Sequence, residues 1–361
     1  MKIGVLKEHK SGENRVAAVP ETVMKYVALG FTVMVESQAG VAAGFENKLY
    51  ADAGADITLN RKNIFDMADI ILSVWGIPEH EYNLLQPKQI LIADFESLKY
   101  PKKIKRLAKT GVVALALERM PRISRAQIAD IMSSQSNIAG YKAAMLGMNL
   151  LNRAIPLMMT AAGTIVPAKA LVLGAGVAGL QAIATLKRMG AVVYASDVRA
   201  SAREQVESLG GRFLSVDDNA DFENQSGYAG EISEQYLAKQ KQVLTEQLKQ
   251  TDILITTALS AGGKAPELIS AAMASVMPQY AVIVDMAGGN VASANLRADI
   301  LLVKERNMAA LVPDTASKLF ARNVLNLLEM YGGKNFNLPP DDEILKAIAI
   351  CGYQELKENY K

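Results

Sequence analysis

The chain has 361 residues, of which 50% are hydrophobic and 21% are charged. This length suggests about two domains, and the composition is ordinary for a folded protein and argues against global disorder. A net charge of +2 gives no electrostatic reason to expect a nucleic acid or an anionic membrane as the main partner.

The rarest residue types exclude further classes of protein. The single cysteine, Cys351, excludes a disulfide within the chain and fits a reducing compartment. With only two histidines, His9 and His80, a zinc site of His and Cys ligands is nearly excluded. The N-terminus turns charged before a long apolar region forms, so we expect no signal peptide. The most apolar region, 154–186, is interrupted by prolines, glycines and Lys169, which predicts a strand followed by a buried helix rather than a membrane span.

Short runs rich in β-branched residues alternate with segments of helical period along the chain. One series of expected strands covers residues 2–8, 32–37, 70–75, 90–95 and 112–117. A second series covers residues 170–176, 192–198, 212–216, 253–259, 281–287 and 300–303. Apolar strands that alternate with helices predict parallel sheets built from βαβ units, so we expect an α/β protein with two Rossmann-like lobes around a cleft.

The two series are joined by residues 119–168, which we interpret as a loop followed by a long helix. An amphipathic helix at 320–333 is expected to return to the first lobe. The predicted domains are therefore a first lobe of residues 1–131 together with 320–361, and a second lobe of residues 132–319.

The sequence GAGVAG at 174–179 matches the GxGxxG pattern of dinucleotide-binding proteins. The pattern alone is weak, but here it follows an expected strand and opens an expected helix. In this context Gly174 allows a tight turn, Gly176 lets the backbone approach a pyrophosphate, and Gly179 lets the helix pack closely on the strand. The helix N-terminus would present free N–H groups to the phosphates, which favours a nucleotide site over a turn without a ligand.

The next expected strand ends at Asp197, about 20 residues after the glycine turn. A carboxylate at this position accepts hydrogen bonds from the adenosine ribose and repels a 2′-phosphate, which favours NAD over NADP. Arg199 is a mild counter-signal, because an arginine near this position can pair with a 2′-phosphate.

Beyond this fingerprint, the chain resembles the alanine dehydrogenase/transhydrogenase superfamily from Met1 to about Leu328. Within it, the chain is similar to the NAD(H)-binding domain I of proton-translocating nicotinamide nucleotide transhydrogenase. The opening KIGVLKE, with Arg15 and VAAVP, is similar to the start of the superfamily's members. The motifs that resemble transhydrogenase in particular are MPRISRAQ (120–127), DIMSSQSNIAGY (130–141), TAAGT (160–164), GAGVAGLQAIATLKRMGA (174–191), DVR (197–199), EQVESLGG (204–211) and ITTAL (255–259).

The resemblance implies a group of catalytic residues. Arg122, Gln127 and Asp130 match a loop that in this family contacts the nicotinamide end of the cofactor, and Ser133 matches a residue that holds the carboxamide. Such donors and acceptors fix the orientation of the ring, and orientation is most of what hydride transfer requires of a protein. A salt bridge between the lobes is the alternative explanation for Arg122 and Asp130.

The resemblance also implies a set of residues that bind the cofactor. They are Gly174, Gly176, Val177, Ala178, Gly179, Asp197, Val198, Arg199, Tyr228, Ala258 and Leu259. Tyr228 matches the tyrosine of a mobile loop that closes over the nucleotide in this family. The polar, acidic composition of 217–230, with its glycines, independently predicts a surface loop, and an ordinary exposed tyrosine is the alternative.

The sister alanine dehydrogenases resemble this chain but use a lysine and a histidine beside an arginine. Arg15 matches the arginine, Ser73 aligns with the lysine, and residues 91–97 contain no histidine. Reduction of an imine needs a proton donor, whereas hydride transfer between two nicotinamides does not. The missing lysine and histidine therefore favour a transhydrogenase over an NAD-dependent amino-acid dehydrogenase, which is the first alternative.

Three segments depart from the family pattern. The sequence DMAGGN at 285–290 lacks the spacer that the family has before GGN. The stretch 312–323, which we interpret as a loop, is shorter than in the family and lacks an arginine that is usual there, and 260–269 lacks the favoured proline and glycine before its lysine. A regulatory subunit that binds NAD(H) with weakened or no hydride transfer is the second alternative, and these departures favour it.

The resemblance thus implies a soluble α subunit of a proton-translocating transhydrogenase, in which NADH reduces NADP⁺ held by a partner. It also implies a homodimer, a membrane subunit and an NADP(H)-binding subunit as partners. We expect the chain in the cytoplasm, attached through these partners to the cytoplasmic face of the inner membrane.

Overall fold

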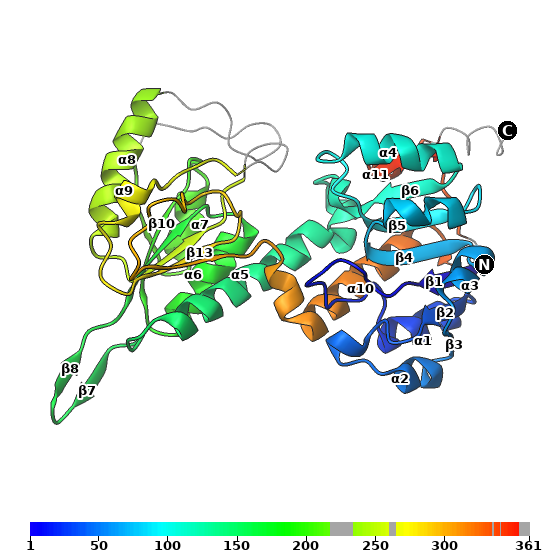
Figure 1. The fold of residues 1–361 in the computed structure, drawn as a ribbon, viewed down its shortest axis with the longest axis horizontal. Coiled ribbons are helices and arrows are strands. Elements are labelled where there is room, and N and C mark those ends of the chain that lie inside the picture. Colours follow the sequence, from blue (N-terminus) through cyan, green and yellow to red (C-terminus); the bar gives the residue numbers. More distant parts are fainter. Residues whose placement is uncertain (217–233, 260–264, 334–335, 340, 354–361) are drawn as a thin grey trace. The chain divides into compact units, whose positions relative to one another are not determined.

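The computed structural model describes residues 1–361 except 217–233, 260–264, 334–335, 340 and 354–361. Contacts divide the chain into two units (Figure 1). Unit 1 comprises residues 1–135 and 309–361, and unit 2 comprises residues 136–308. The domain boundaries expected from the sequence, at 131/132 and 319/320, stay a prediction about which regions fold independently.

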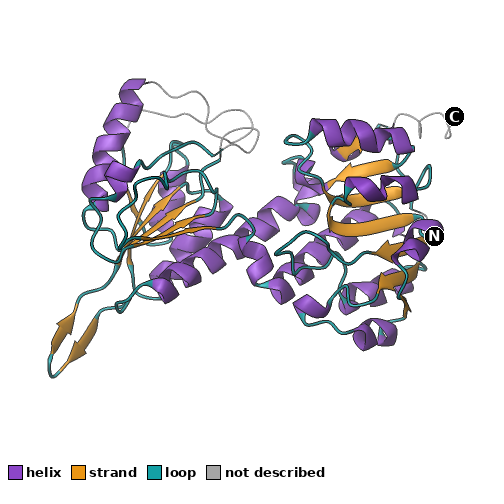
Figure 2. Cartoon of the chain, in the orientation of Figure 1, coloured by secondary structure: helices purple, strands orange, loops and turns teal. Residues whose placement is uncertain are grey.

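Unit 1 is built on a seven-stranded sheet. In spatial order its strands are β3 (Ala55–Thr58), β2 (Thr32–Glu36), β1 (Lys2–Val5), β4 (Ile70–Trp75), β5 (Ile90–Asp94), β6 (Val113–Ala116) and β15 (Ala349–Cys351). The first six strands are parallel, and β15 is antiparallel to β6. The inner strands are apolar along their whole length because both faces of the sheet are covered by helices (Figure 2).

The helices of unit 1 bury two separate cores on the two faces of this sheet. One core is formed with α1 (Pro20–Ala28), α2 (Asn47–Asp52), α10 (Pro313–Met330) and α11 (Glu343–Ile348). The other is formed with α3 (Arg61–Met67) and α4 (Pro101–Leu107). The 3₁₀ turns are η1 (Val41–Ala43), η2 (Glu79–Leu84), η3 (Ala108–Thr110), η4 (Leu117–Arg119), η5 (Ser124–Ala129) and η6 (Met308–Leu311).

Unit 2 is built on a six-stranded sheet that is entirely parallel. In spatial order its strands are β11 (Arg212–Phe213), β10 (Val192–Ser196), β9 (Lys169–Leu173), β12 (Ile253–Thr256), β13 (Val282–Asp285) and β14 (Leu301–Lys304). One face is covered by α5 (Ile131–Leu150), α6 (Val177–Arg188) and α7 (Ala202–Ser208). The other face is covered by α8 (Glu234–Leu248) and α9 (Ala271–Ala274).

The two sheets have the same strand order. Counted along the chain within each unit, both read 3-2-1-4-5-6, and unit 1 adds the antiparallel β15 beside its sixth strand. In this order the chain reverses direction across the sheet beside its first strand, between β1 and β4 in unit 1 and between β9 and β12 in unit 2. Open α/β sheets bind ligands at the carboxyl ends of the strands at such a switch point. The predicted α/β class with parallel sheets is confirmed.

Several elements differ from the sequence expectation. The sequence pattern did not predict β3, β15, or the hairpin of β7 (Met158–Thr160) and β8 (Gly163–Ile165), which Figure 1 shows extending away from the rest of unit 2. The interpretation of 312–323 as a loop is wrong, because α10 begins at Pro313. Proline at the first helical position has a dihedral angle that suits a helix, and Asp314 in the first turn complements the helix dipole.

Among the described residues, no helix combines the length and the apolar character needed to cross a bilayer.

Candidate nucleotide-binding site

The glycine turn after β9 is held by close backbone packing. Gly174 has a φ of +93°, and its N–H donates to the Ser196 carbonyl oxygen at 2.9 Å. A Cβ at Gly174 would lie 2.6 Å from the Thr257 hydroxyl oxygen, and a Cβ at Gly179 would lie 1.8 Å from the Gly174 carbonyl oxygen. Only glycine fits at these two positions, because a side chain would force α6 away from the strands.

Gly176 lies at the N-terminus of α6 in a different environment. A Cβ built on this residue would have no atom within 4 Å, and its φ of −76° is open to any residue type. The space beside Gly176 is therefore not needed by the fold. Because glycine has no side chain to cap the helix, the N–H groups of the first turn, at Val177 and Ala178, are available to an anion.

Asp197 follows β10 and contacts the same turn. Its Oδ2 accepts a hydrogen bond from the Ala175 N–H at 2.7 Å. The Arg199 guanidinium donates to both carboxylate oxygens, through Nε at 2.9 Å and Nη2 at 2.8 Å. Burial alone would raise the pKa of Asp197, but the hydrogen bonds and charge of Arg199 outweigh it and lower this pKa below its usual range. Asp197 is therefore an ionised carboxylate at the carboxyl edge of the sheet.

The segment after β12 lies on the other side of the switch point. The Thr257 hydroxyl donates to the Gly174 carbonyl oxygen at 3.0 Å, which ties this segment to the glycine turn. Ala258 follows, and Leu259 is 38% exposed. The structure thus brings the turn, Asp197 and Ala258 to one edge of unit 2, as a dinucleotide site requires. Tyr228, the remaining predicted contact, lies outside the described residues.

Gly140 is a contact of this site that the sequence analysis missed. It lies on α5, and a Cβ there would be 2.0 Å from the carbonyl oxygen of Ala178 in the first turn of α6. The α5 backbone therefore packs directly against the start of the helix whose N–H groups face the phosphate position. A glycine within a predicted helix, as in NIAGYKAA, is the available sequence signal for such a close approach.

The predicted catalytic residues lie in and around η5 of unit 1. Arg122, Gln127 and Ser133 are exposed, and Asp130 is partly buried. The structure brings Asp130 and Ser133 together, because the Asp130 carboxylate accepts the Ser133 N–H at 3.1 Å and also its hydroxyl. This is the geometry of a helix N-cap, so Asp130 has a structural role at the start of α5.

Two asparagines of α10 hold this segment in place. The side-chain amides of Asn323 and Asn326 both donate to the Ile128 carbonyl oxygen, at 2.9 and 2.7 Å. Asn323 also accepts the Ser134 hydroxyl at 2.7 Å. The residues between Gln127 and Asp130 are thus fixed to a long helix, which gives an exposed segment a defined backbone.

Comparison with known families assigns both halves of the chain. Residues 4–139 match the family described as "Alanine dehydrogenase/PNT, N-terminal domain", and residues 143–357 match "Alanine dehydrogenase/PNT, C-terminal domain". The chain belongs to the alanine dehydrogenase/PNT family.

Similar proteins within this family are transhydrogenase subunits. The chain is 44% identical over 353 residues to the first of the proteins that form NAD(P) transhydrogenase subunit alpha in Rhodospirillum rubrum, with 93% of this chain and 91% of that protein covered. The corresponding protein from Rickettsia prowazekii (strain Madrid E) is 39% identical, with 97% and 94% covered. The crystal structure of transhydrogenase from Sinorhizobium meliloti matches with a TM-score of 0.84 and 36% identity over 97% of both chains. The resemblance inferred from the motifs is confirmed.

The carboxyl edge of the unit 1 sheet differs chemically from that of unit 2 in this family member. Arg15 is buried and donates to both carboxylate oxygens of Glu13, at 2.8 and 2.7 Å. The indole N–H of Trp75 donates to the same carboxylate at 2.6 Å. The Glu8 carboxylate accepts the backbone N–H groups of Val74 at 2.6 Å and of Trp75 at 3.3 Å.

Two carboxyl groups at this edge have raised pKa values. Burial raises the pKa of Glu8 from 4.5 to about 7, and the charge of Glu13 adds to this effect. Burial and the charge of Glu118 raise the pKa of Asp94. Ser73, which aligns with the lysine of alanine dehydrogenases, is buried and its hydroxyl has no hydrogen-bond partner among the described residues. In the described part of the chain, no cluster of His, Cys, Asp and Glu side chains could hold a metal ion.

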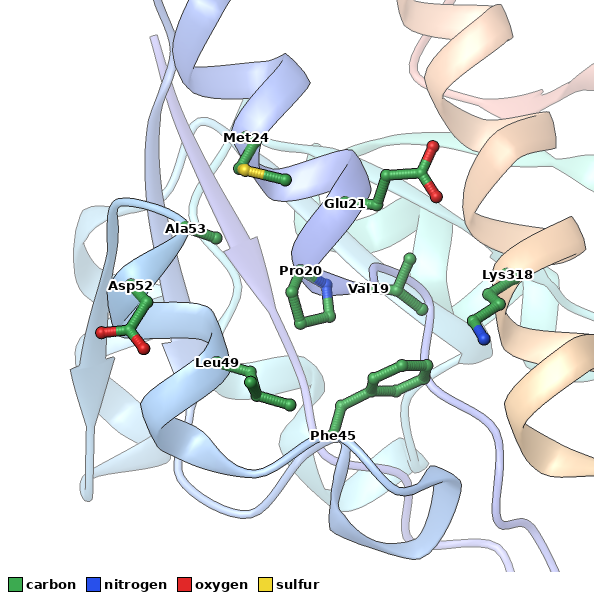
Figure 3. Close-up of a pocket in the computed structure, with 9 residues that line it drawn as sticks. All are labelled: Val19, Pro20, Glu21, Met24, Phe45, Leu49, Asp52, Ala53 and Lys318. Carbon is green, nitrogen blue, oxygen red and sulfur yellow. The ribbon is translucent and has the colours of Figure 1, made fainter.

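A pocket of about 330 Å³ also lies in unit 1, between α1, α2 and Lys318 of α10 (Figure 3). Apolar side chains such as Met24 and Phe45 form most of its lining. It contains the N-terminus of α1, but Pro20 has no N–H to donate and Glu21 is negatively charged. This helix N-terminus is therefore a much weaker phosphate site than that of α6.

Proposed function

We propose that the chain is the NAD(H)-binding α subunit of a proton-translocating transhydrogenase. The observation that carries this proposal is the edge of unit 2, where an uncapped helix N-terminus, an open position at Gly176 and the ionised Asp197 lie together. The similarity to NAD(P) transhydrogenase α subunits supports the reaction.

In this proposal the pyrophosphate binds at the N-terminus of α6 and the adenosine ribose hydroxyls donate to Asp197. Val198 and Arg199 line the adenosine side, and Ala258 and Leu259 line the opposite side. Arg122, Gln127, Asp130 and Ser133 contact the nicotinamide and orient its ring. NADH would then give its hydride to NADP⁺ held by a partner, so that NAD⁺ and NADPH are formed.

The partners belong to the proposal as well. A membrane subunit and an NADP(H)-binding subunit would supply the rest of the reaction and attach the chain to the cytoplasmic face of the inner membrane. The hairpin of unit 2 supports a homodimer, because Met159 is 80% exposed and Val166 is 61% exposed. Exposed apolar side chains gathered on one element mark interaction surfaces.

The homodimer has a direct test. The double variant Met159→Lys/Val166→Lys should shift the chain from dimer to monomer in analytical ultracentrifugation. Leu59→Lys is the matched control, because Leu59 is 90% exposed but lies in unit 1. A dimer that is equally stable in the double variant would exclude the hairpin as the interface.

The function is tested by mixing the chain with a transhydrogenase NADP-binding domain. We expect NADPH to reduce an NAD⁺ analogue only when both components are present. Nucleotide binding without any transfer would favour the regulatory subunit, and no NADH binding would exclude the proposal as a whole.

An amino-acid dehydrogenase is a second candidate because of the acids in unit 1. A carboxyl group with a pKa near 7, as for Glu8, is suited to general acid catalysis at neutral pH, so the loss of the lysine and histidine does not remove every proton donor. Reduction of NAD⁺ in the presence of L-alanine alone would establish this activity. We expect none, because the Glu8 carboxylate is occupied by two backbone N–H groups.

A further inference from the structure

Asn290 is fully buried, and its side-chain amide joins two points of the backbone. Nδ2 donates to the carbonyl oxygen of Ala258 at 2.9 Å and to that of Pro266 at 2.7 Å. The opposite orientation of the amide would place Oδ1 against two carbonyl oxygens, so these contacts define its orientation. Oδ1 itself has no partner among the described residues. An unpaired buried acceptor is unfavourable, which indicates that the two donor contacts are what this residue provides.

The short turn between β13 and Asn290 is ordered by a buried carboxylate. Asp285 is fully buried and accepts the Thr256 hydroxyl at 3.1 Å, the Gly288 N–H at 2.9 Å and the Val291 N–H at 3.2 Å. Gly288 has a φ of +74°, which favours glycine. The turn DMAGGN, which lacks the spacer of the family, is therefore a defined support that fixes the position of Asn290.

The residue that Asn290 holds lies against the glycine turn. A Cβ at Gly174 would be 3.3 Å from the backbone nitrogen of Ala258, so these two segments are in close contact. In the sheet order of unit 2, Asp197 follows β10 on one side of β9, and Ala258 follows β12 on the other. When adenosine binds on the β10 side and the pyrophosphate binds at α6, the β12 side receives the nicotinamide half.

We propose that Asn290 is a positioning residue for the nicotinamide half of the cofactor. It acts through Ala258, which it holds at the edge of the crevice, and the turn 285–290 supports it from behind. The inference rests on the proposed NAD(H) site and adds to it a residue that touches no part of the cofactor. It also gives the shortened turn a role in cofactor placement.

The test compares two ligands that differ only at the nicotinamide end. Asn290→Asp keeps the side-chain volume but replaces both N–H donors by an oxygen, and Asn290→Ala is a second variant should the first not fold. Calorimetric titrations of the full chain use NADH and ADP-ribose, which lacks the nicotinamide. Thr251→Val is the matched control, because the buried Thr251 hydroxyl donates to the Gln247 carbonyl oxygen at the opposite end of β12.

We expect both Asn290 variants to bind NADH about tenfold more weakly while ADP-ribose binding changes by less than about twofold. Thr251→Val should lower the melting temperature and leave both affinities unchanged. Unchanged NADH binding in the Asn290 variants would overturn the inference, and so would an equal loss for both ligands, because that pattern indicates general destabilisation. If the wild-type chain bound no NADH, the proposed function would fail, which is a different result from a failure of the Asn290 variants alone.

Discussion

The switch points of the two units are built from the same strand order but filled by opposite chemistry. In unit 2 the first strand is followed by a glycine turn, with an open position at Gly176 and a helix N-terminus. In unit 1 the first strand is followed by Glu8, whose carboxylate accepts the N–H groups of Val74 and Trp75 in the fourth strand. Unit 1 thus places its own anion at its switch point, whereas unit 2 leaves that position to a ligand.

The surroundings of the two sites reinforce this difference. Around Glu8, the edge of unit 1 also carries Glu13, Asp94 and Glu118, and it has Arg15 as a buried cation. A pyrophosphate would be repelled there. Strand order therefore fixes where a ligand site lies in such a fold, and the first residues after the strand decide whether the site accepts an anion.

Gly176→Val is the substitution that should affect unit 2 most. Its side chain would occupy the open space beside the helix N-terminus, where no protein atom lies within 4 Å. We expect NADH affinity to fall at least about a thousandfold, which corresponds to about 4 kcal/mol, while circular dichroism and the melting temperature stay close to wild type. Gly179→Ala is the contrast, because its Cβ would collide with the Gly174 carbonyl oxygen and should lower stability as well. Full NADH binding by Gly176→Val would place the phosphate site elsewhere.

Glu8→Gln tests the built-in anion of unit 1 through the pH dependence of stability. The folded-state pKa of Glu8 is raised from 4.5 to about 7, so its contribution to stability is fully present below pH 4.5 and is lost as the pH rises through 7. Across that range the free energy of unfolding of the wild type should fall relative to the variant by up to about 3 kcal/mol. Urea denaturation at several pH values measures this difference, and Glu21→Gln controls for the loss of an exposed acid. Parallel curves for wild type and Glu8→Gln would show that Glu8 ionises normally.

Asp197→Ala tests the specificity of the open site. The wild type should bind NADH more tightly than NADPH, and the variant should lose about 1–3 kcal/mol of that preference. The structure adds a second effect, because Arg199 donates to both oxygens of Asp197 and would be released to pair with a 2′-phosphate. The double variant Asp197→Ala/Arg199→Ala separates the two effects by titration with both nucleotides. Equal affinities of the wild-type chain for NADH and NADPH would contradict the assignment of Asp197.

The sequence predicted the fold of unit 2 well, because each of its strands is a short apolar run and its turn carries glycines where a backbone must approach closely. It could not predict the hairpin at 158–165, because exposed residues such as Met159 have the same apolar pattern as a buried strand. Nor could it predict β15, whose pairing with β6 joins segments far apart in the chain. The interpretation of the stretch after Val312 as a loop was wrong because a proline is typical both of loops and of the first turn of a helix.

The candidate site shows the same division between local and distant information. The spacing of Gly174, Gly176 and Asp197 is local, and so it is visible in the sequence. Asn290 and Gly140 reach the site only through the folded chain, by contacts with Ala258 and Ala178 that no spacing rule contains. The pKa of Glu8 likewise depends on burial and on neighbours from another strand.

The smallest expected effect concerns the residues proposed to orient the nicotinamide. Gln127→Ala removes an exposed side chain, whereas Asp130→Ala would also remove the N-cap of α5, so Asp130→Asn is the better variant because asparagine retains the capping acceptor. Each should slow hydride transfer about tenfold, or about 1.4 kcal/mol, and change the NADH dissociation constant little, because most binding contacts lie on the adenosine and pyrophosphate. Ser124→Ala, in the same exposed turn, is the control. Stopped-flow transfer to an NAD⁺ analogue and calorimetric titration measure the two quantities separately. A loss of affinity as large as the loss of rate would mean that these side chains serve binding alone, and no change in either quantity would leave unit 1 without a role in the reaction.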